Sequence, residues 1–377
     1  MLFSTIPGQE KVKEKLIRTV VDQRNSHAQL FFGLDGGAQM ALALAYIQYL
    51  MCEDPSDEDS CGHCPSCLQN MKLIHPDVHF SYPFAKTAKS SDKPTSTEYL
   101  EDWRSLLLEN PYATRMNWLQ KLGIENKQAI INVRESDEIS RKLQLKSYSG
   151  GYKVMIIWLP ESLHMSAANK LLKLIEEPQP KTLILLVSNQ REAILQTILS
   201  RTQGISVPPY NKEAIRGYLE KLHPHHRALD FAVLKAEGSM GHGLEFLKQQ
   251  PLFAEYSDWF VRLNRAAFKP DVQELLVLAE TVGQQVREKQ KDFLQFALSL
   301  YEATFLMNQE VEQPRLVPLE EAGFKTAGFS KFIEPQVAIK IQSSFERAIF
   351  EIGRNAAGKI VLLDTFLQLS KDLRKRP

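Results

Sequence analysis

Residues 28–50 read "AQLFFGLDGGAQMALALAYIQYL": an apolar run, a glycine-rich turn and an alanine-rich apolar stretch. The order strand, glycine turn, helix is that of a phosphate-binding loop. Three glycines keep the turn: Gly33, Gly36 and Gly37. Where such a loop carries lysine and then serine or threonine, this chain has Gln39 and Met40, which offer neither a positive charge nor a magnesium ligand. We expect that the chain keeps the backbone of a phosphate loop but binds no nucleotide there. The alternative is a glycine-rich turn unrelated to nucleotides.

A second apolar run, "KVMII" at 153–157, bears on the same question. In a nucleotide hydrolase, acidic residues follow this run, hold Mg²⁺ and polarise the attacking water. Here Trp158 and Leu159 follow, and Glu161 comes two positions late, past the expected end of the strand. Because the lysine, the hydroxyl and both acids are missing together, we expect no intrinsic ATPase activity.

The composition is that of a globular protein, with 377 residues, 44% hydrophobic and 24% charged, and a formal net charge of +1. This length allows two or three domains. Near neutrality gives no general reason to expect binding to nucleic acid or membranes. No apolar run approaches the roughly 18 residues of a membrane helix, and the first residues lack the basic-then-apolar layout of a secretion signal. We therefore expect a cytoplasmic protein with no membrane partner.

Helical and strand patterns alternate through the first part of the chain. We expect helices at 10–23, 37–52 and 166–177, and buried strands at 28–33, 152–159 and 182–189. This alternation predicts an α/β fold with a parallel sheet between helices. Residues 84–128 are polar and turn-rich at first, and we expect them to form a partly mobile insertion outside the core. After residue 210 every pattern is helical.

All four cysteines lie in one segment: Cys52, Cys61, Cys64 and Cys67. In a reducing compartment such clustering favours a metal over disulfides. Two overlapping C-x₂-C spacings let thiolates converge on Zn²⁺, which prefers four tetrahedral ligands, so we expect structural zinc with His63 outside the ligand set. An iron–sulfur cluster is the alternative. A DNA-reading finger is disfavoured because no basic or aromatic stripe follows.

Three segments in order resemble those of bacterial sliding-clamp loaders: "HAQLFFGLDGGAQ" at 27–39, a long stretch at 152–189 and "ILSRTQGI" at 198–205. Within the second, "AANKLLKLIEEP" at 167–178 is similar to the "NALLKTLEEP" signature of these proteins. The likeness covers roughly residues 1–80 and 130–250. A degenerate phosphate loop combined with an intact Ser-Arg pair most resembles the delta-prime subunits of DNA polymerase III, since gamma/tau subunits keep both nucleotide motifs.

The resemblance implies an AAA+ chain in three parts. These are a RecA-like P-loop domain at 1–208, a helical lid at 209–250 and an all-α collar at 251–377, with a zinc module at 52–67 inside the first. It also implies a ring formed with gamma/tau and delta subunits, which loads the sliding clamp onto primer-template DNA within the polymerase III holoenzyme. The alternative is a gamma/tau-like clamp-loader ATPase with degenerate motifs.

The resemblance further assigns site residues. Ser200 and Arg201 match the family's Ser-Arg-Cys motif, with Thr202 in place of the cysteine, so Arg201 is expected to act as an arginine finger on a neighbouring subunit's ATP. The competing interpretation is an arginine paired with a nearby acid. Gly241 stands where active relatives carry a sensor arginine, and no functional ATP site is expected. The empty loop would be collapsed or filled by a side chain such as that of Met40.

Overall fold

The structure, a computed structural model, describes residues 1–88, 90–226, 228–248, 250–309, 324 and 326–374. The chain divides into two compact units, described here one at a time. The first holds Met1–Leu222 with Val233–Glu245, and the second holds His223–Ala232 with Phe246–Pro377. The three-domain division at 208 and 250 remains a prediction.

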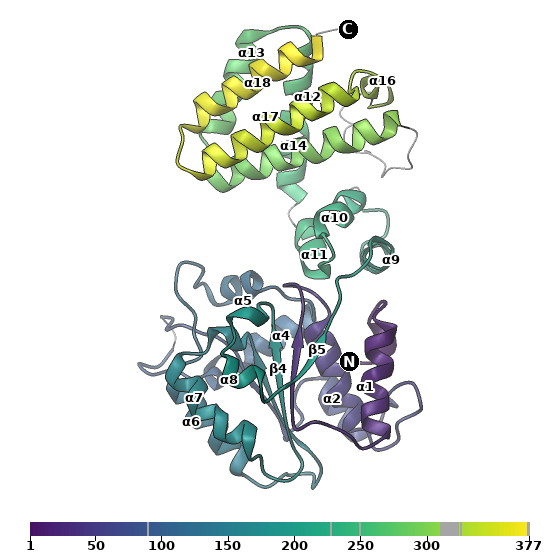
Figure 1. Ribbon diagram of the computed structural model, residues 1–377, viewed down its shortest axis with the longest axis vertical. Helices are drawn as coiled ribbons and strands as arrows, with labels where there is room; N and C mark the ends of the chain where they lie inside the picture. Colours follow the sequence, from purple (N-terminus) through teal and green to yellow (C-terminus); the bar gives the residue numbers. More distant parts are fainter. Residues whose placement is uncertain (89, 227, 249, 310–323, 325, 375–377) are drawn as a thin grey trace. The chain divides into compact units, whose positions relative to one another are not determined.

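A five-stranded parallel sheet forms the centre of the first unit (Figure 1). Its spatial order is β2 (Val78–Ser81), β3 (Lys153–Trp158), β4 (Thr182–Ser188), β1 (Ala28–Phe32) and β5 (Gln203–Ser206). Every residue of β3 and β4 is buried, which accounts for their unbroken apolar sequences. β1 pairs with β4 so that Phe32 lies opposite Ser188. The residues following these two strands therefore meet at one edge of the sheet.

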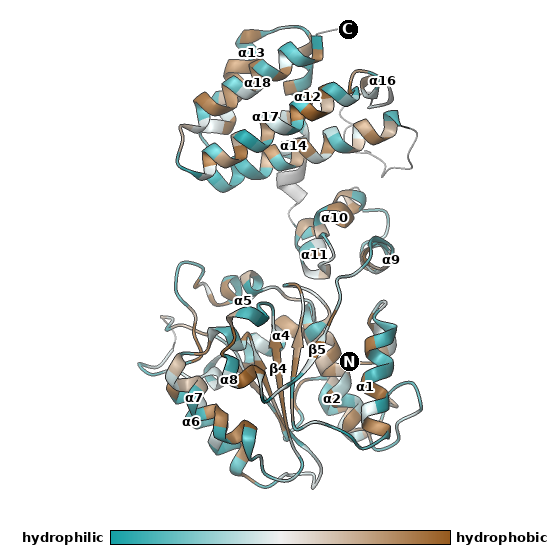
Figure 2. Cartoon of the chain, in the orientation of Figure 1, coloured by the Kyte–Doolittle hydropathy of each residue, from teal (hydrophilic) through white to brown (hydrophobic). Residues whose placement is uncertain are grey.

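Helices lie on both faces of this sheet, with α1 and α2 on one side and α6, α7 and α8 on the other (Figure 1). The helices and short 3-10 turns of this unit are η1 (Phe3–Thr5), α1 (Glu10–Val21), α2 (Gln39–Leu50), α3 (Pro65–Met71), η2 (Ser96–Tyr99), α4 (Leu100–Glu109), α5 (Arg115–Leu122), α6 (Val133–Gln144), η3 (Pro160–Ser162), α7 (Met165–Glu176), η4 (Arg191–Ala193), α8 (Gln196–Leu199) and α9 (Lys212–Leu222). Two more helices, α10 (Leu229–Ala236) and α11 (Met240–Lys248), each have residues in both units. The central strands of the sheet, such as β4, are coloured as hydrophobic in Figure 2. One core cluster joins Leu30 and Ile184 of the sheet to Ile139 of α6 and Leu171 of α7. The predicted RecA-like α/β fold is confirmed.

The second unit contains the helices α12 (Gln250–Phe268), α13 (Val272–Gly283), α14 (Arg287–Asn308), α16 (Thr326–Ser330), α17 (Pro335–Gly353) and α18 (Gly358–Arg374). Its core is aromatic: the Tyr301 ring lies 5.1 Å from Phe260 and 5.5 Å from Phe345. Over its described residues this unit has no strand, as the predicted all-α collar requires. Across the described parts of the chain, no helix is both long and apolar enough to cross a membrane.

The expectation that residues 84–128 lie outside the core is wrong. Trp103 of α4 and Trp118 of α5 are fully buried. The Trp103 ring stacks on Tyr82 at 4.4 Å and lies 5.0 Å from Trp158, the last residue of β3. The segment therefore covers the end of the sheet. The first third of the segment is polar, but two short amphipathic helices follow it, and each buries a tryptophan ring.

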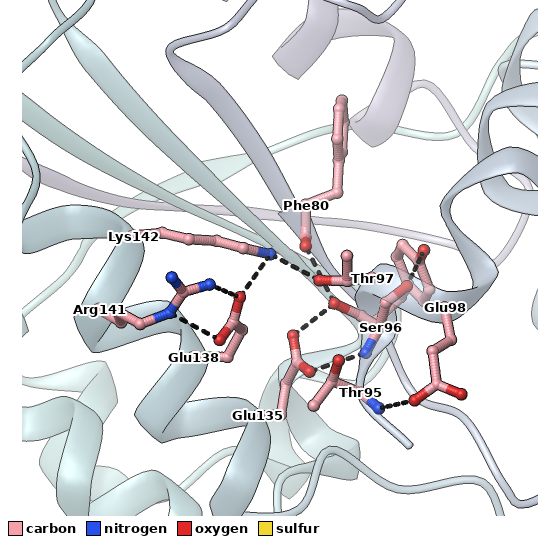
Figure 3. A network of polar contacts seen from close by, with 10 residues as sticks. Phe80, Thr95, Ser96, Thr97, Glu98, Glu135, Glu138, Arg141 and Lys142 are labelled. Carbon is pink, nitrogen blue, oxygen red and sulfur yellow. Dashed lines mark hydrogen bonds and ion pairs between the residues drawn. The ribbon is translucent and has the colours of Figure 1, made fainter. Parts of the chain in front are cut away.

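One buried carboxylate fastens this segment to α6. Glu135 is fully buried and accepts hydrogen bonds from the Ser96 backbone N–H at 2.8 Å and the Ser96 hydroxyl at 2.5 Å (Figure 3). These bonds satisfy a buried polar group that would otherwise cost about 1–3 kcal/mol. The start of α4 is thus held against α6 beside the edge strand β2.

Candidate functional site

The side chain of Gln39, the first residue of α2, fills the glycine turn. Its amide Nε2 donates to the Leu34 carbonyl at 2.7 Å, and only 2% of the residue is exposed. A Cβ added at Gly37 would lie 2.4 Å from Gln39 Oε1, so the amide lies directly against the loop backbone. Gln39, and not Met40, is therefore the residue that fills the loop.

Asp35 links the loop to two other elements. Its carboxylate accepts from the side-chain amide of Asn189, which follows β4, and from the Arg115 backbone N–H at 3.2 Å, at the start of α5. Burial raises the pKa of the Asp35 carboxyl, although the Arg115 N–H works against that rise. A carboxylate at this position opposes a triphosphate by charge. The sequence analysis did not identify Asp35 as a site residue, although its position between Gly33 and Gly36 could have indicated it.

The start of α11 and Ser239 just before it pack onto the same loop. The Gly241 N–H donates to the Gly36 carbonyl at 2.9 Å, and the Ser239 hydroxyl donates to the Asp35 carbonyl at 2.7 Å. A Cβ at Gly241 would lie 2.2 Å from the Tyr112 carbonyl oxygen and 2.9 Å from the Gly36 Cα. The position predicted to lack a sensor arginine is thus a close contact between backbones, which admits no side chain.

The end of β3 carries no acid, in agreement with the sequence. Leu159 adopts a left-handed conformation with φ 54°, and a single 3-10 turn follows. Glu161 in that turn accepts from the Ser188 hydroxyl at 2.9 Å and the Asn189 N–H at 3.1 Å. Burial raises the pKa of its carboxyl. Glu161 therefore braces the end of β4.

Arg201 follows α8 and is held at the end of α7. Its Nε donates to Glu176 Oε1, and its Nη1 donates to the Thr197 carbonyl at 2.9 Å and the Ser200 hydroxyl at 3.2 Å. The side chain remains 38% exposed. In the isolated chain, Arg201 is thus paired with a nearby acid, which was the competing interpretation from the sequence. An exposed pair of this kind contributes only about 0–1 kcal/mol, so it presents little barrier to exchange of partner.

The four cysteines converge. The sulfur atoms of Cys52, Cys61, Cys64 and Cys67 all lie within 4.8 Å of one another. Backbone N–H groups point at three of them, including Cys61 N–H to Cys52 Sγ at 3.3 Å and Cys64 N–H to Cys61 Sγ at 3.3 Å. N–H groups directed at sulfur suit thiolates bound to a metal. His63 is exposed, with Nδ1 2.9 Å from the Cys61 carbonyl oxygen.

The cysteine segment also holds the beginning of the chain, a link that the sequence did not suggest. Asp59 accepts from the backbone N–H groups of Phe3 at 3.1 Å and Ser4 at 2.9 Å. The Phe3 ring is buried 6.0 Å from that of Tyr49 in α2. The segment that carries the cysteines is therefore hydrogen-bonded to η1, which in turn packs on α2.

A family profile described as "DNA polymerase III, delta subunit" matches residues 8–211, more than half of the chain. The chain belongs to that family. The DNA polymerase III subunit delta' of Escherichia coli K12 is 29% identical over 234 residues, 61% of this chain and 57% of that protein. The same subunit of Yersinia pestis is 32% identical over 180 residues, 47% of this chain and 40% of its own length. The predicted delta-prime resemblance is confirmed.

More distant members of the clamp-loader group also match. The DNA polymerase III subunit tau of Bacillus subtilis is 22% identical over 67% of this chain and 38% of its own length. A gamma-subunit-related protein of Thermotoga maritima, of known structure, covers 96% of this chain and 99% of its own at 15% identity and a TM-score of 0.39. The chain spans about half the length of the curated delta-prime relatives it matches.

Substituting Gly241 tests the contact with the loop. We expect Gly241→Ala to lower the free energy of unfolding by about 1–3 kcal/mol, because its Cβ overlaps the Tyr112 carbonyl. The matched control is Gly217→Ala in α9, where a Cβ meets nothing within 4 Å and should stabilise the helix by up to about 1 kcal/mol. Urea unfolding of both variants measures the difference. Equal effects would show that the Gly241 contact is not close-packed.

Proposed function

We propose that this chain is a non-hydrolysing subunit of the bacterial sliding-clamp loader. It would assemble with gamma/tau and delta subunits and act on the sliding clamp and primer-template DNA through the assembled ring, in the cytoplasm. The family membership supports this assignment. The observation that carries it is a contrast: Gln39 fills the phosphate loop, whereas Arg201 stays at the surface.

We propose that Arg201 completes the ATP site of an adjacent gamma/tau subunit. A guanidinium is always charged and planar, and it can donate to two oxygens of a γ-phosphate as negative charge develops there. In this chain alone the same group pairs with Glu176. If the Arg201 guanidinium moved from that exposed carboxylate to a triphosphate, it would exchange a weak ion pair for a partner of higher negative charge. Ser200 lies beside the guanidinium and orients it through its hydroxyl.

We propose structural zinc in the cysteine cluster and no ATP in the loop. The cluster supplies four sulfur ligands, the number that closes a tetrahedral site without room for water. Zinc bound there would cross-link residues 52–67 and would take no part in a reaction. For the loop, a neutral amide, a nearby carboxylate and the Gly241 backbone contact all act against a bound triphosphate.

The finger is tested in the reconstituted loader. Arg201→Ala should leave assembly intact and reduce turnover at the neighbouring ATP site by about 10³-fold or more, since arginine fingers contribute that much to catalysis. The matched control is Arg141→Ala, which breaks another exposed Arg–Glu pair, that with Glu138. The measurement is clamp-dependent ATP hydrolysis alongside gel filtration. Unchanged hydrolysis in an intact ring would remove Arg201 from the mechanism. Hydrolysis by this chain alone would support the alternative, a gamma/tau-like ATPase.

The metal is tested by elemental analysis of the purified chain. We expect one zinc per chain in the wild type and a loss of most of it in Cys67→Ser, because a buried ligand is removed. His63→Ala should retain full zinc content, since His63 lies outside the four sulfurs. Iron in place of zinc, or zinc lost only in the histidine variant, contradicts the assignment.

A further inference from the structure

A small cleft lies beside the edge strand β2, apart from the loop and the cysteine cluster. Its volume is about 190 Å³, and its walls come from the segment 74–80, the start of α4 and the end of α6. Its charged or titratable lining residues are His75, His79, Arg104 and Lys142. Among the described residues that line it there is no aspartate or glutamate. The two charged side chains of the lining, Arg104 and Lys142, are therefore both cationic.

The two cations are held in place. Arg104 donates from Nε to the Leu73 carbonyl at 2.8 Å, and no described residue accepts from its Nη groups. The Lys142 side chain is only 18% exposed, and its Nζ lies 3.1 Å from the Thr97 hydroxyl (Figure 3). Cations anchored in this way lose little conformational freedom on binding an anion.

The histidines add neutral donors. His75 is 5% exposed, and its Nδ1 accepts from the Asp77 backbone N–H at 3.2 Å, so the ring proton lies on Nε2. No described residue accepts from that Nε2. Burial, followed by the charge of Lys142, lowers the pKa of His79 to about 4. Burial is the larger cause, and the Lys142 charge acts in the same direction.

The nearest acids are already engaged. Glu138 accepts from Arg141 Nη2 at 2.6 Å and lies 3.8 Å from Lys142 Nζ (Figure 3). Asp77 accepts from the Ser149 N–H at 2.9 Å and the Ser149 hydroxyl at 2.6 Å, and these bonds hold the loop before β3. Glu135 likewise accepts from the N–H and the hydroxyl of Ser96, a lining residue. None of these three carboxylates lines the cleft, and an entering anion would compete with Glu138 for Lys142.

We propose that this cleft binds a phosphate group through Arg104, Lys142 and the Nε2–H of His75. A guanidinium, an ammonium and a neutral imidazole are the donors that phosphate oxygens accept from in proteins. The group could belong to a nucleic-acid strand or to free phosphate, which share this chemistry. The proposal goes beyond the loader assignment and does not depend on it.

The test is titration of the full chain with inorganic phosphate, followed by calorimetry or ³¹P line broadening. Lys142→Gln should weaken the affinity by about tenfold, the loss of one charge-assisted hydrogen bond. The matched control is Lys72→Gln, which removes the same charge from an exposed position of the same region outside the lining. Arg104→Gln provides a second variant should Lys142→Gln fail to fold. No saturable binding, or equal weakening in Lys72→Gln, would overturn the proposal.

Two oligonucleotides identify the source of the phosphate. A 5′-phosphorylated thymidine oligomer and its 5′-hydroxyl counterpart are compared by fluorescence anisotropy. Preference for the 5′-phosphate that disappears in Lys142→Gln assigns a strand end, and equal Lys142-dependent binding of both assigns the strand backbone. Binding of inorganic phosphate alone assigns a free phosphate. Oligomer binding that is indifferent to Lys142→Gln would contradict a nucleic-acid source at this cleft.

Discussion

The hydrogen bond from the Gln39 amide to the Leu34 carbonyl is the contact on which the proposed loss of nucleotide binding depends. It places a neutral side chain inside a turn whose backbone would otherwise present N–H groups to phosphate. The Asp35 carboxylate then adds a negative charge next to that turn. The α/β fold around the loop is kept, while these two side chains oppose the binding of a triphosphate in it.

The same closure ties four parts of the chain together. The ends of β1 and β4 meet through Asp35 and Asn189, α5 joins through the Arg115 N–H, and the start of α11 joins through Gly241. In a nucleotide-binding relative, such parts move relative to one another as ligand comes and goes. Here all of these contacts lie within one unit of the chain, which is compatible with the proposed role of a subunit that has no nucleotide cycle of its own.

How far the sequence could predict this depended on how local each signal was. Buried strands such as 182–188 can be predicted from an unbroken run of apolar residues, and the metal site from the spacing of the four cysteines. The missing lysine was equally visible, but the position of the Gln39 amide was not, because its neighbour Asn189 lies 150 residues away. The burial of Trp103 was missed for a similar reason: its partners, Tyr82 and Trp158, belong to other elements. The partner of Arg201 could not be identified for the same reason, because Glu176 belongs to another motif, the one at 167–178.

The most direct measurement is equilibrium dialysis of the purified wild-type chain against radiolabelled ATP with magnesium, at millimolar nucleotide. No saturable binding is expected, because the amide of Gln39 fills the turn and Asp35 repels the phosphates. One ATP bound per chain, and lost in Gln39→Ala, would mean that Gln39 holds the nucleotide and does not replace it.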